Sequence, residues 1–280
     1  MRQRFLARTP TVKSFQILTT ILAVSGTFSG TALAGPSSSA AAGWTKYVAA
    51  TEVRIDRELQ GNEVFLRLDI LNPQQASRTR QQLKKGDIYI RKDTNSVGNA
   101  QLDGALIHHW LGAIFIPNTM LDDVLHFVQN YNDHRLYFKE VERSQLNKRN
   151  GDTFDVYLRL VRTNIVTVRY DTYHTAVYRR HDAKHASSRS VATRIVEVSD
   201  EPGKDSGFLW RLNSYWRFSE EDNGVFVECE SLSLSRSIPF GLAWLVGGYI
   251  DSVPRESLES TLISIRQGLT ARTRNREARR

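Results

Sequence analysis

The 280-residue chain is 40% hydrophobic and 24% charged, a composition typical of a globular protein that buries its own core in one large domain or two small ones. Its single cysteine, Cys229, excludes an internal disulfide. The net charge of +8 would suit a nucleic-acid-binding protein, but residues 1–34 and 270–280 contribute +4 each and leave the body near neutral. The body has no basic stripe with interleaved aromatic residues, so we expect no specific binding of nucleic acid.

Residues 1–34 have the order of a secretory signal peptide. A basic start is followed by the uncharged run FQILTTILAVSGTFSG and by Ala32-x-Ala34, a cleavage-like site before Gly35. The alternative is a retained membrane anchor, because the apolar run has about the ~20 residues that a spanning helix needs. We expect an exported protein, periplasmic or in the cell envelope, with a cleaved leader.

The next segments have no recognisable motif. Residues 35–43, GPSSSAAAG, are small and predict a flexible linker. Within residues 44–101, EVFLRLDIL alternates like a strand, QQASRTRQQLKKGD predicts a helix or loop, and DIYIRKD predicts a short strand. We interpret residues 44–101 as an N-terminal extension packed on the main domain.

A regular pattern begins near Leu102. LIHHWLGAIFIP predicts a strand that ends at Pro117, and NTMLDDVLHFVQNY predicts a helix capped by Asn118 or Thr119. Several apolar residues of this helix recur at helical spacing and should face inward: Leu121, Val124, Leu125, Val128 and Tyr131.

Six strand-like runs follow, separated by the turn-forming sequences RNGD, HDAKHAS, DEPGKDSG and EEDNG. The runs are VERSQLNK, TFDVYLRLVR, NIVTVRYDTYHTAVYRR, SRSVATRIVEV, GFLWRLNSYWRFS and GVFVECESLSLSRS. Sequential strands with short links predict an antiparallel meander. Together with the flanking helices, they predict an α+β fold.

The last long pattern, IPFGLAWLVGGYIDSVPRESLESTLISIRQGL, predicts a helix that lies on the sheet. Its uncharged stretch, residues 240–250, is well short of a membrane span. An apolar stripe continues on both sides of Pro254, where we expect a break. The arginine-rich residues 270–280 form a basic tail, for which we weigh two alternatives: a solvated terminus or a contact with anionic lipid head groups.

Three stretches together resemble the START-like superfamily, also called SRPBCC, which includes lipid-transfer domains, coenzyme Q-binding proteins and polyketide cyclases. They are residues 112–146, the last strand pair (GFLWRLNSYWRF and GVFVECESLSLSRSIP) and the closing helix. The resemblance covers residues 102–269 and implies a helix-grip fold, in which a curved antiparallel sheet of about seven strands wraps around a long C-terminal helix. It also implies a cavity between the sheet and that helix.

No sequence motif indicates a catalytic or metal site, and we expect neither a metal nor a cofactor. Nucleotide-binding, zinc-protease and serine-hydrolase motifs are missing. His108 and His109 are adjacent on a strand, so they should point to opposite faces. His181 and His185 lie in a predicted hairpin loop without a third ligand nearby. Cys229 is interpreted as a small buried hydrophobe.

The candidate ligand-binding residues come from strand alternation. One face of GFLWRLNSYWRFS carries Trp210, Ser214 and Trp216, an aromatic wall that could line a cavity or simply pack in the core. The polar groups that could anchor a ligand are Tyr170, Thr172 and His174 on an earlier strand, with Ser214. Tyr249 on the closing helix completes the predicted set.

The sequence leaves three hypotheses for the function. The first is an exported START-like protein that binds or carries a hydrophobic small molecule or lipid, such as a quinone or polyketide-like compound, without covalent chemistry. The second is an enzyme of the polyketide cyclase or dehydratase kind, in which a desolvated Tyr or His acts as general acid–base. The third is an envelope protein-interaction module. The first is preferred, and the sequence does not indicate an oligomeric state.

Overall fold

The computed structural model describes residues 35–61, 64–71, 73–94, 102, 104–163, 167–199, 209–237 and 243–277. All of them belong to one compact unit, residues 32–280. The predicted signal peptide lies outside the described residues. So do the side chains of residues 243–251, Tyr249 among them.

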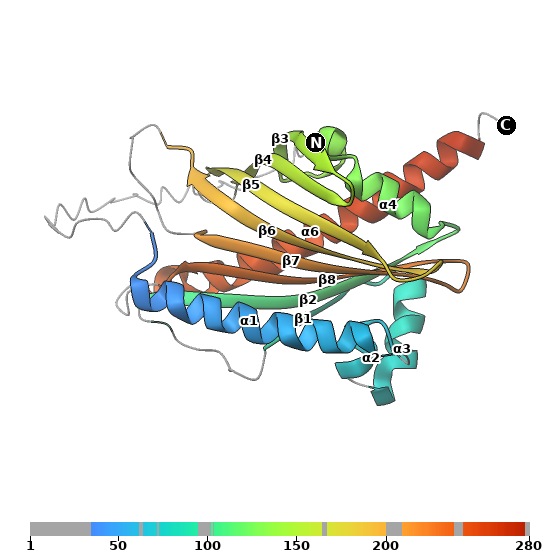
Figure 1. Ribbon diagram of the computed structural model, residues 1–280, viewed down its shortest axis with the longest axis horizontal. Helices are drawn as coiled ribbons and strands as arrows, with labels where there is room; N and C mark the ends of the chain where they lie inside the picture. The colour runs from blue at the N-terminus through green and yellow to red at the C-terminus, as the bar shows by residue number, and fades with distance from the viewer. Residues whose placement is uncertain are drawn as a thin grey trace, which may run out of the picture. The chain divides into compact units, whose positions relative to one another are not determined.

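One antiparallel sheet of eight strands organises the chain (Figure 1). The strands are β1 (Tyr89–Lys92), β2 (Ala105–Pro117), β3 (Val141–Asn150), β4 (Thr153–Thr163), β5 (Thr167–Arg180), β6 (His185–Glu197), β7 (Arg211–Glu221) and β8 (Gly224–Arg236). Their order across the sheet is β1-β2-β8-β7-β6-β5-β4-β3. The predicted meander is therefore confirmed. β2 closes it by pairing with β8 along its whole length.

The C-terminal helix α6 (Ala243–Glu277) lies against one face of this sheet, which we call the inner face. Its stripe of Leu258, Leu262, Ile265 and Leu269 is buried, as the periodicity predicted. Shorter helices join it there: α4 (Leu121–Gln129), the 3-10 turn η1 (Tyr131–Asp133) and α5 (His134–Tyr137). The predicted α+β fold, with one antiparallel sheet and a long C-terminal helix against it, is thus confirmed, with eight strands in place of about seven.

A glycine lets α6 approach β2 closely. A Cβ added at Gly112 would lie 2.7 Å from Cδ1 of Leu262 and 3.0 Å from Cδ2 of Leu258, closer than side chains pack. The missing side chain at this position therefore sets the distance between the helix and the sheet.

Two details of the inner helices differ from the sequence predictions. The helix α6 runs through Pro254 without the expected break, and it continues to Glu277 through most of the predicted basic tail, where Arg272 stacks over Phe127 and Tyr137. Neither predicted cap precedes α4 directly. Instead, the backbone N–H of Leu121 donates to the Glu220 carboxylate at 2.6 Å.

The segment before β2 forms a second helical layer on the outer face of the sheet. It contains α1 (Ser38–Gln60), α2 (Arg67–Leu71) and α3 (Pro73–Lys84). The predicted flexible linker 35–43 is therefore largely wrong, because Ser37 caps α1 by accepting a hydrogen bond from the N–H of Ala40, and Ala40 is fully buried. Likewise, the segment predicted as an extension supplies β1 to the sheet itself.

The predicted strand EVFLRLDIL is also wrong, since it contains the short helix α2. The backbone N–H groups of Arg67 and Leu68 both donate to the buried carboxylate of Glu228 on β8, which satisfies the first turn of that helix. This partner is distant in the sequence, so a local alternation could not reveal it.

Helices on both faces explain why β2 and β8 are buried almost throughout. Even-numbered residues of β2, such as Ile114, face α4 and α6, while odd-numbered residues, such as Ile107 and Leu111, face α1–α3. Within the described residues, no helix is both long and apolar enough to be a candidate membrane span.

The close approach at Gly112 generates a stability prediction. The substitution Gly112→Val should lower the free energy of unfolding by about 1–3 kcal/mol, because the added methyl groups overlap the leucines of α6. Urea denaturation measures this change. Gly35→Val is the matched control, since no atom lies within 4 Å of a Cβ added there; equal stability of the two variants would contradict the prediction.

Candidate functional site

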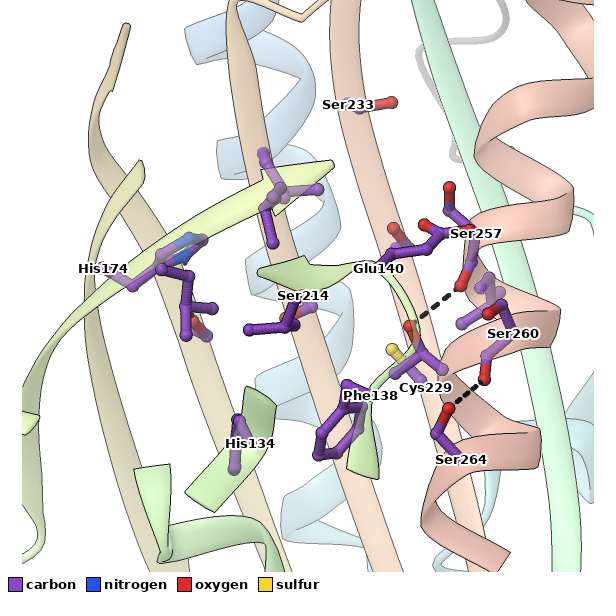
Figure 2. Close-up of a pocket in the computed structure, with 18 of the residues that line it drawn as sticks. His134, Phe138, Glu140, His174, Ser214, Cys229, Ser233, Ser257, Ser260 and Ser264 are labelled. Atoms are coloured by element: carbon purple, nitrogen blue, oxygen red, sulfur yellow. Dashed lines mark hydrogen bonds between the residues drawn. The ribbon is translucent and has the colours of Figure 1, made fainter. Parts of the chain in front are cut away.

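A cavity of about 350 Å³ lies between the inner face of the sheet and α6 (Figure 2). Strands β4 to β8, the segment around α5 and the middle of α6 supply its walls. Most of the lining is apolar, with Leu158, Leu212 and Trp216 on the sheet and Leu258 and Ile265 on the helix. The cavity is therefore a space enclosed mainly by aliphatic and aromatic side chains.

Figure 2 shows polar groups on two opposite walls of the cavity. His174 and Ser214 belong to the sheet, and Ser257, Ser260 and Ser264 belong to α6. Ser264 donates to the backbone oxygen of Ser260 at 2.8 Å, and Thr261 donates to that of Ser257 at the same distance. Each bond commits the hydroxyl hydrogen to the helix itself and leaves only oxygen lone pairs available.

His174 is held by a short chain of hydrogen bonds. The hydroxyl of the fully buried Thr172 donates to the backbone oxygen of Leu158 at 3.0 Å, and Nε2 of His174 lies 2.9 Å from the same hydroxyl oxygen. Ser190 Oγ lies 3.5 Å from Nδ1, at the limit of a hydrogen bond. Burial lowers the pKa of His174 to about 4, so its ring is neutral near pH 7.

A second polar cluster of the lining lies on η1, α5 and β5. Nε2 of His134 donates to the backbone oxygen of Val128 at 3.0 Å, and burial lowers the pKa of His134 to about 4 despite this bond. The hydroxyls of Tyr131 and Tyr178 are 2.8 Å apart. Burial raises the pKa of both tyrosines, to about 12 for Tyr178. These groups are consequently neutral as well.

The charged side chains of the lining are confined to one edge. Among the described residues around the cavity, only Lys139, Glu140 and Arg162 are charged. Arg162 on β4 forms ion pairs with Glu140, just before β3, and with Glu256 on α6. It therefore connects the sheet edge to the helix across one rim of the cavity.

Cys229 also lines the cavity, from β8. Burial raises the pKa of its thiol well above the usual value, and the nearby carboxylates of Glu230 and Glu228 raise it further. A thiol so reluctant to ionise is a poor nucleophile. The interpretation of Cys229 as a small buried hydrophobe agrees with this setting.

The cavity collects four of the seven predicted ligand-binding residues: Tyr170, His174, Ser214 and Trp216. Thr172 is not in the lining; it supports His174 from behind. Trp210 is a wrong prediction, because it precedes the first residue of β7 and packs on the outer face with residues of α1. The side chain of Tyr249 lies outside the described residues.

The sequence reasoning missed the hydroxyls of α6, His134 and the Arg162 bridge. A signal for the first group was present, because Ser257, Ser260, Thr261 and Ser264 recur at helical spacing beside the leucine stripe. No comparable signal marked Arg162, whose two partners are distant in the sequence.

The outer face holds a separate cluster with metal-binding residue types. Ligand atoms of Asp93, His109 and Glu230 lie within 4.8 Å of one another, all buried. However, Nε of Arg67 donates to Asp93 at 2.7 Å, and Glu230 pairs with Arg54 and lies 2.7 Å from Nε2 of His109. Guanidinium groups already occupy both carboxylates, so the cluster has the character of an ion-pair network.

This network joins the helical layer to the sheet. Four carboxylates take part, from Glu58, Asp93, Glu228 and Glu230, with the guanidinium groups of Arg54, Arg67 and Arg217 and the imidazole of His109. Burial raises the pKa of Glu228 to about 7. Burial alone would also raise the pKa of Glu230, but the hydrogen bond from His109 and the nearby arginines lower it to about 2.

The remaining histidines do not form a shared site. His108 faces the cavity and His109 the outer network, as their adjacent strand positions predicted. In the β5–β6 hairpin, His185 Nδ1 bonds Asp182 and His181 Nε2 bonds Ser187, and both rings contact Phe65.

Comparisons with known proteins give structural similarity alone. No family model matches the chain, and no curated protein matches it in sequence. A STAR-related lipid transfer protein from Xanthomonas axonopodis is similar with a TM-score of 0.45 and 20% identity, covering 65% of this chain and 98% of that one. Human StAR-related lipid transfer protein 5 is similar with a TM-score of 0.44 and 10% identity, covering 73% and 98%. An aromatase/cyclase from Streptomyces has a TM-score of 0.39 and 12% identity, covering 60% and 96%.

The outer ion-pair network predicts that removing one of its guanidinium groups strongly lowers the stability of the fold. Arg67→Met should lower the free energy of unfolding by about 3–5 kcal/mol, because it leaves the buried Asp93 without its closest positive charge and removes one of the guanidinium partners of Glu58. Arg169→Met, which breaks an exposed pair with Glu142, should cost about 1 kcal/mol or less. Chemical denaturation of both variants tests this, and similar losses would contradict a structural role for the network.

His174 predicts a pH dependence of stability. Its pKa is about 4 in the folded chain, and the ordinary value in the unfolded chain is about 6.5, so the unfolded state binds more protons between these values. The contribution of neutral, buried His174 to the free energy of unfolding is therefore fully present above pH 6.5 and is lost as the pH decreases towards 4.

Between pH 7 and pH 5, the wild type should lose about 1–2 kcal/mol more stability than His174→Gln. Urea denaturation at the two pH values measures the difference. His126→Gln, on the exposed side of α4, is the control and should retain the wild-type loss. An identical loss in all three proteins would show that burial of His174 does not govern this dependence.

Proposed function

We propose that the chain binds an apolar small molecule reversibly in its cavity and performs no covalent chemistry on it. The observation that carries the proposal is an unfilled space of about 350 Å³ with mainly apolar walls, between the sheet and α6. Small-molecule pockets span about 300–1,000 Å³, so this one suits a compact ligand such as a short chain or a few fused rings. A lipid, quinone or polyketide-like compound of that size is the expected cargo.

The chemistry of the lining supports binding in preference to catalysis. An efficient general base has a pKa near the working pH, whereas His174 and His134 have pKa values of about 4. Tyr178, with a pKa of about 12, is even farther from pH 7 in the other direction. A cyclase-type reaction would therefore need groups other than these.

The interaction-module hypothesis predicts a cavity without room for a ligand, and the cavity volume gives it no support. Export remains part of the proposal and rests on the order of residues 1–34. A lipid-surface contact of the arginine-rich C-terminus is likewise a proposal. Arg272 takes no part in it, since its guanidinium stacks on two aromatic rings of the domain.

Occupancy of the cavity can be measured directly. The full chain is expressed in its native host, purified under mild conditions and examined by native mass spectrometry, followed by organic extraction. We expect a co-purifying apolar species near one molecule per chain, and the mass of the chain reports whether residues 1–34 have been removed. A clean ligand-free mass, unchanged after challenge with lipids and quinones, would refute the proposed function.

A variant that fills the cavity makes the test specific. Ser214→Phe adds a ring to the lining and should reduce occupancy at least about fivefold, which corresponds to the lower end of the ~1–3 kcal/mol cost of overpacking. Val177→Phe adds the same ring to the half-exposed outer face of β5 and should retain the ligand. Loss of the ligand from both variants would point to a binding place other than this cavity.

A further inference from the structure

We infer that the ligand of the cavity carries an uncharged hydroxyl group, which donates a hydrogen bond to Nδ1 of His174. The inference rests on the proposed function and goes beyond it, because it names the chemical group that the site selects and the residue that selects it. Its basis is the set of hydrogen bonds that His174 and other polar groups of the lining make within the protein.

The tautomer of His174 follows from the partner of its other nitrogen. A threonine hydroxyl has one hydrogen, and that of Thr172 is used in the bond to the backbone oxygen of Leu158. The oxygen of Thr172 can therefore only accept from His174, so Nε2 carries the proton. A neutral imidazole has one N–H, which leaves Nδ1 as an acceptor on a ring that lines the cavity.

Among the described residues, no side chain or backbone group is a good donor to this nitrogen. The nearest is the hydroxyl of Ser190, and its oxygen lies 3.5 Å from Nδ1, where a hydrogen bond is at its weakest. A sheltered acceptor with so poor a partner is costly unless a ligand or water satisfies it. A ligand hydroxyl can supply the missing donor.

Three further groups of the lining can accept from a ligand. The hydroxyl hydrogens of Thr261 and Ser264 are committed to carbonyl oxygens of α6, and the N–H of His134 is committed to Val128. These groups can accept from a ligand but cannot donate to it. A ligand that offers only acceptors, such as a ketone or an ether, would leave them unsatisfied.

The charges of the lining favour an uncharged hydroxyl over a charged group on the ligand. The charged groups of the described lining are Lys139, Glu140 and Arg162, and Arg162 is already paired with two carboxylates. A protonated amine beside His174 would lack a buried counter-ion, and a carboxylate would face the lone pair of Nδ1. A neutral alcohol or phenol on an apolar body satisfies both conditions.

The test compares three probes with the same ring system: 2-naphthol, 2-methoxynaphthalene and 2-naphthoate. Their affinities for the purified full chain at pH 7.0 are measured by calorimetry. We expect wild type to bind the naphthol about tenfold more tightly than the ether, the factor that one satisfied hydrogen bond contributes, and to bind the naphthoate most weakly of the three.

Two variants test whether His174 and its hydrogen bond to Thr172 cause the preference for the naphthol. His174→Phe retains a ring but has no acceptor, so the naphthol and the ether should bind with equal affinity. Thr172→Val removes the oxygen that fixes the tautomer and should reduce the preference in the same direction. Thr175→Val, a control on the outer face of the same strand, should keep the wild-type ratio. A ratio of two affinities is insensitive to a uniform loss of folded protein, which thermal unfolding monitors independently.

The outcomes separate the two levels of the proposal. If wild type binds the ether or the naphthoate as tightly as the naphthol, or if His174→Phe keeps the tenfold preference, the hydroxyl inference is overturned and the apolar-ligand function stands. If none of the three probes binds up to their solubility, and no ligand co-purifies from the native host, the proposed function itself is overturned.

Discussion

The pairing of β2 with β8 is the constraint on which the rest of the structure depends. These two strands are distant in the sequence and run antiparallel along their whole length. Each is covered on both faces, by N-terminal helices on the outer side and by the C-terminal helix on the inner side. The N-terminal helices and the C-terminal helix are therefore parts of one cooperative core.

The two covered faces have different physical characters. The inner face is mainly apolar and leaves a cavity with a few neutral polar groups in its walls and charged side chains at one edge. On the outer face, a buried network of carboxylates and guanidinium groups accompanies apolar clusters. Such a network is weak as a source of net stability but demands one geometry, because each misplaced partner leaves a buried charge unpaired. The alternating residues of β8 bring both environments within a single strand, with Cys229 on one side and Glu228 and Glu230 on the other.

The sequence was sufficient where the signal is local. Alternation and turn residues located β3 to β8, and the leucine stripe of α6 identified its buried face. Four of the seven candidate ligand-binding residues line the cavity because strand alternation places them on the face opposite α1.

Failures occurred where a distant partner decides the local structure. Hydrogen bonds to Glu228 stabilise helix α2 in a segment whose alternation predicted a strand. The Ser37 cap and the buried Ala40 likewise start α1 in a stretch whose small residues predicted a linker. Trp210 lies on the outer face of the sheet, where alternation predicted the inner face, because it precedes the first residue of β7. The tautomer of His174 could not be predicted either, since it depends on a carbonyl group on the neighbouring strand β4.

The outer helical layer has a mechanical consequence for the cavity. A sheet that is open on one side can flex to accommodate a bulkier guest, but here part of it is braced by α1–α3 through buried ion pairs. On the other side of the cavity, β4 and α6 are connected instead by the bridge that Arg162 forms. The half that the ion pairs brace is held in place by the N-terminal helices, so a ligand of the proposed kind would enter and leave through the half that contains the Arg162 bridge.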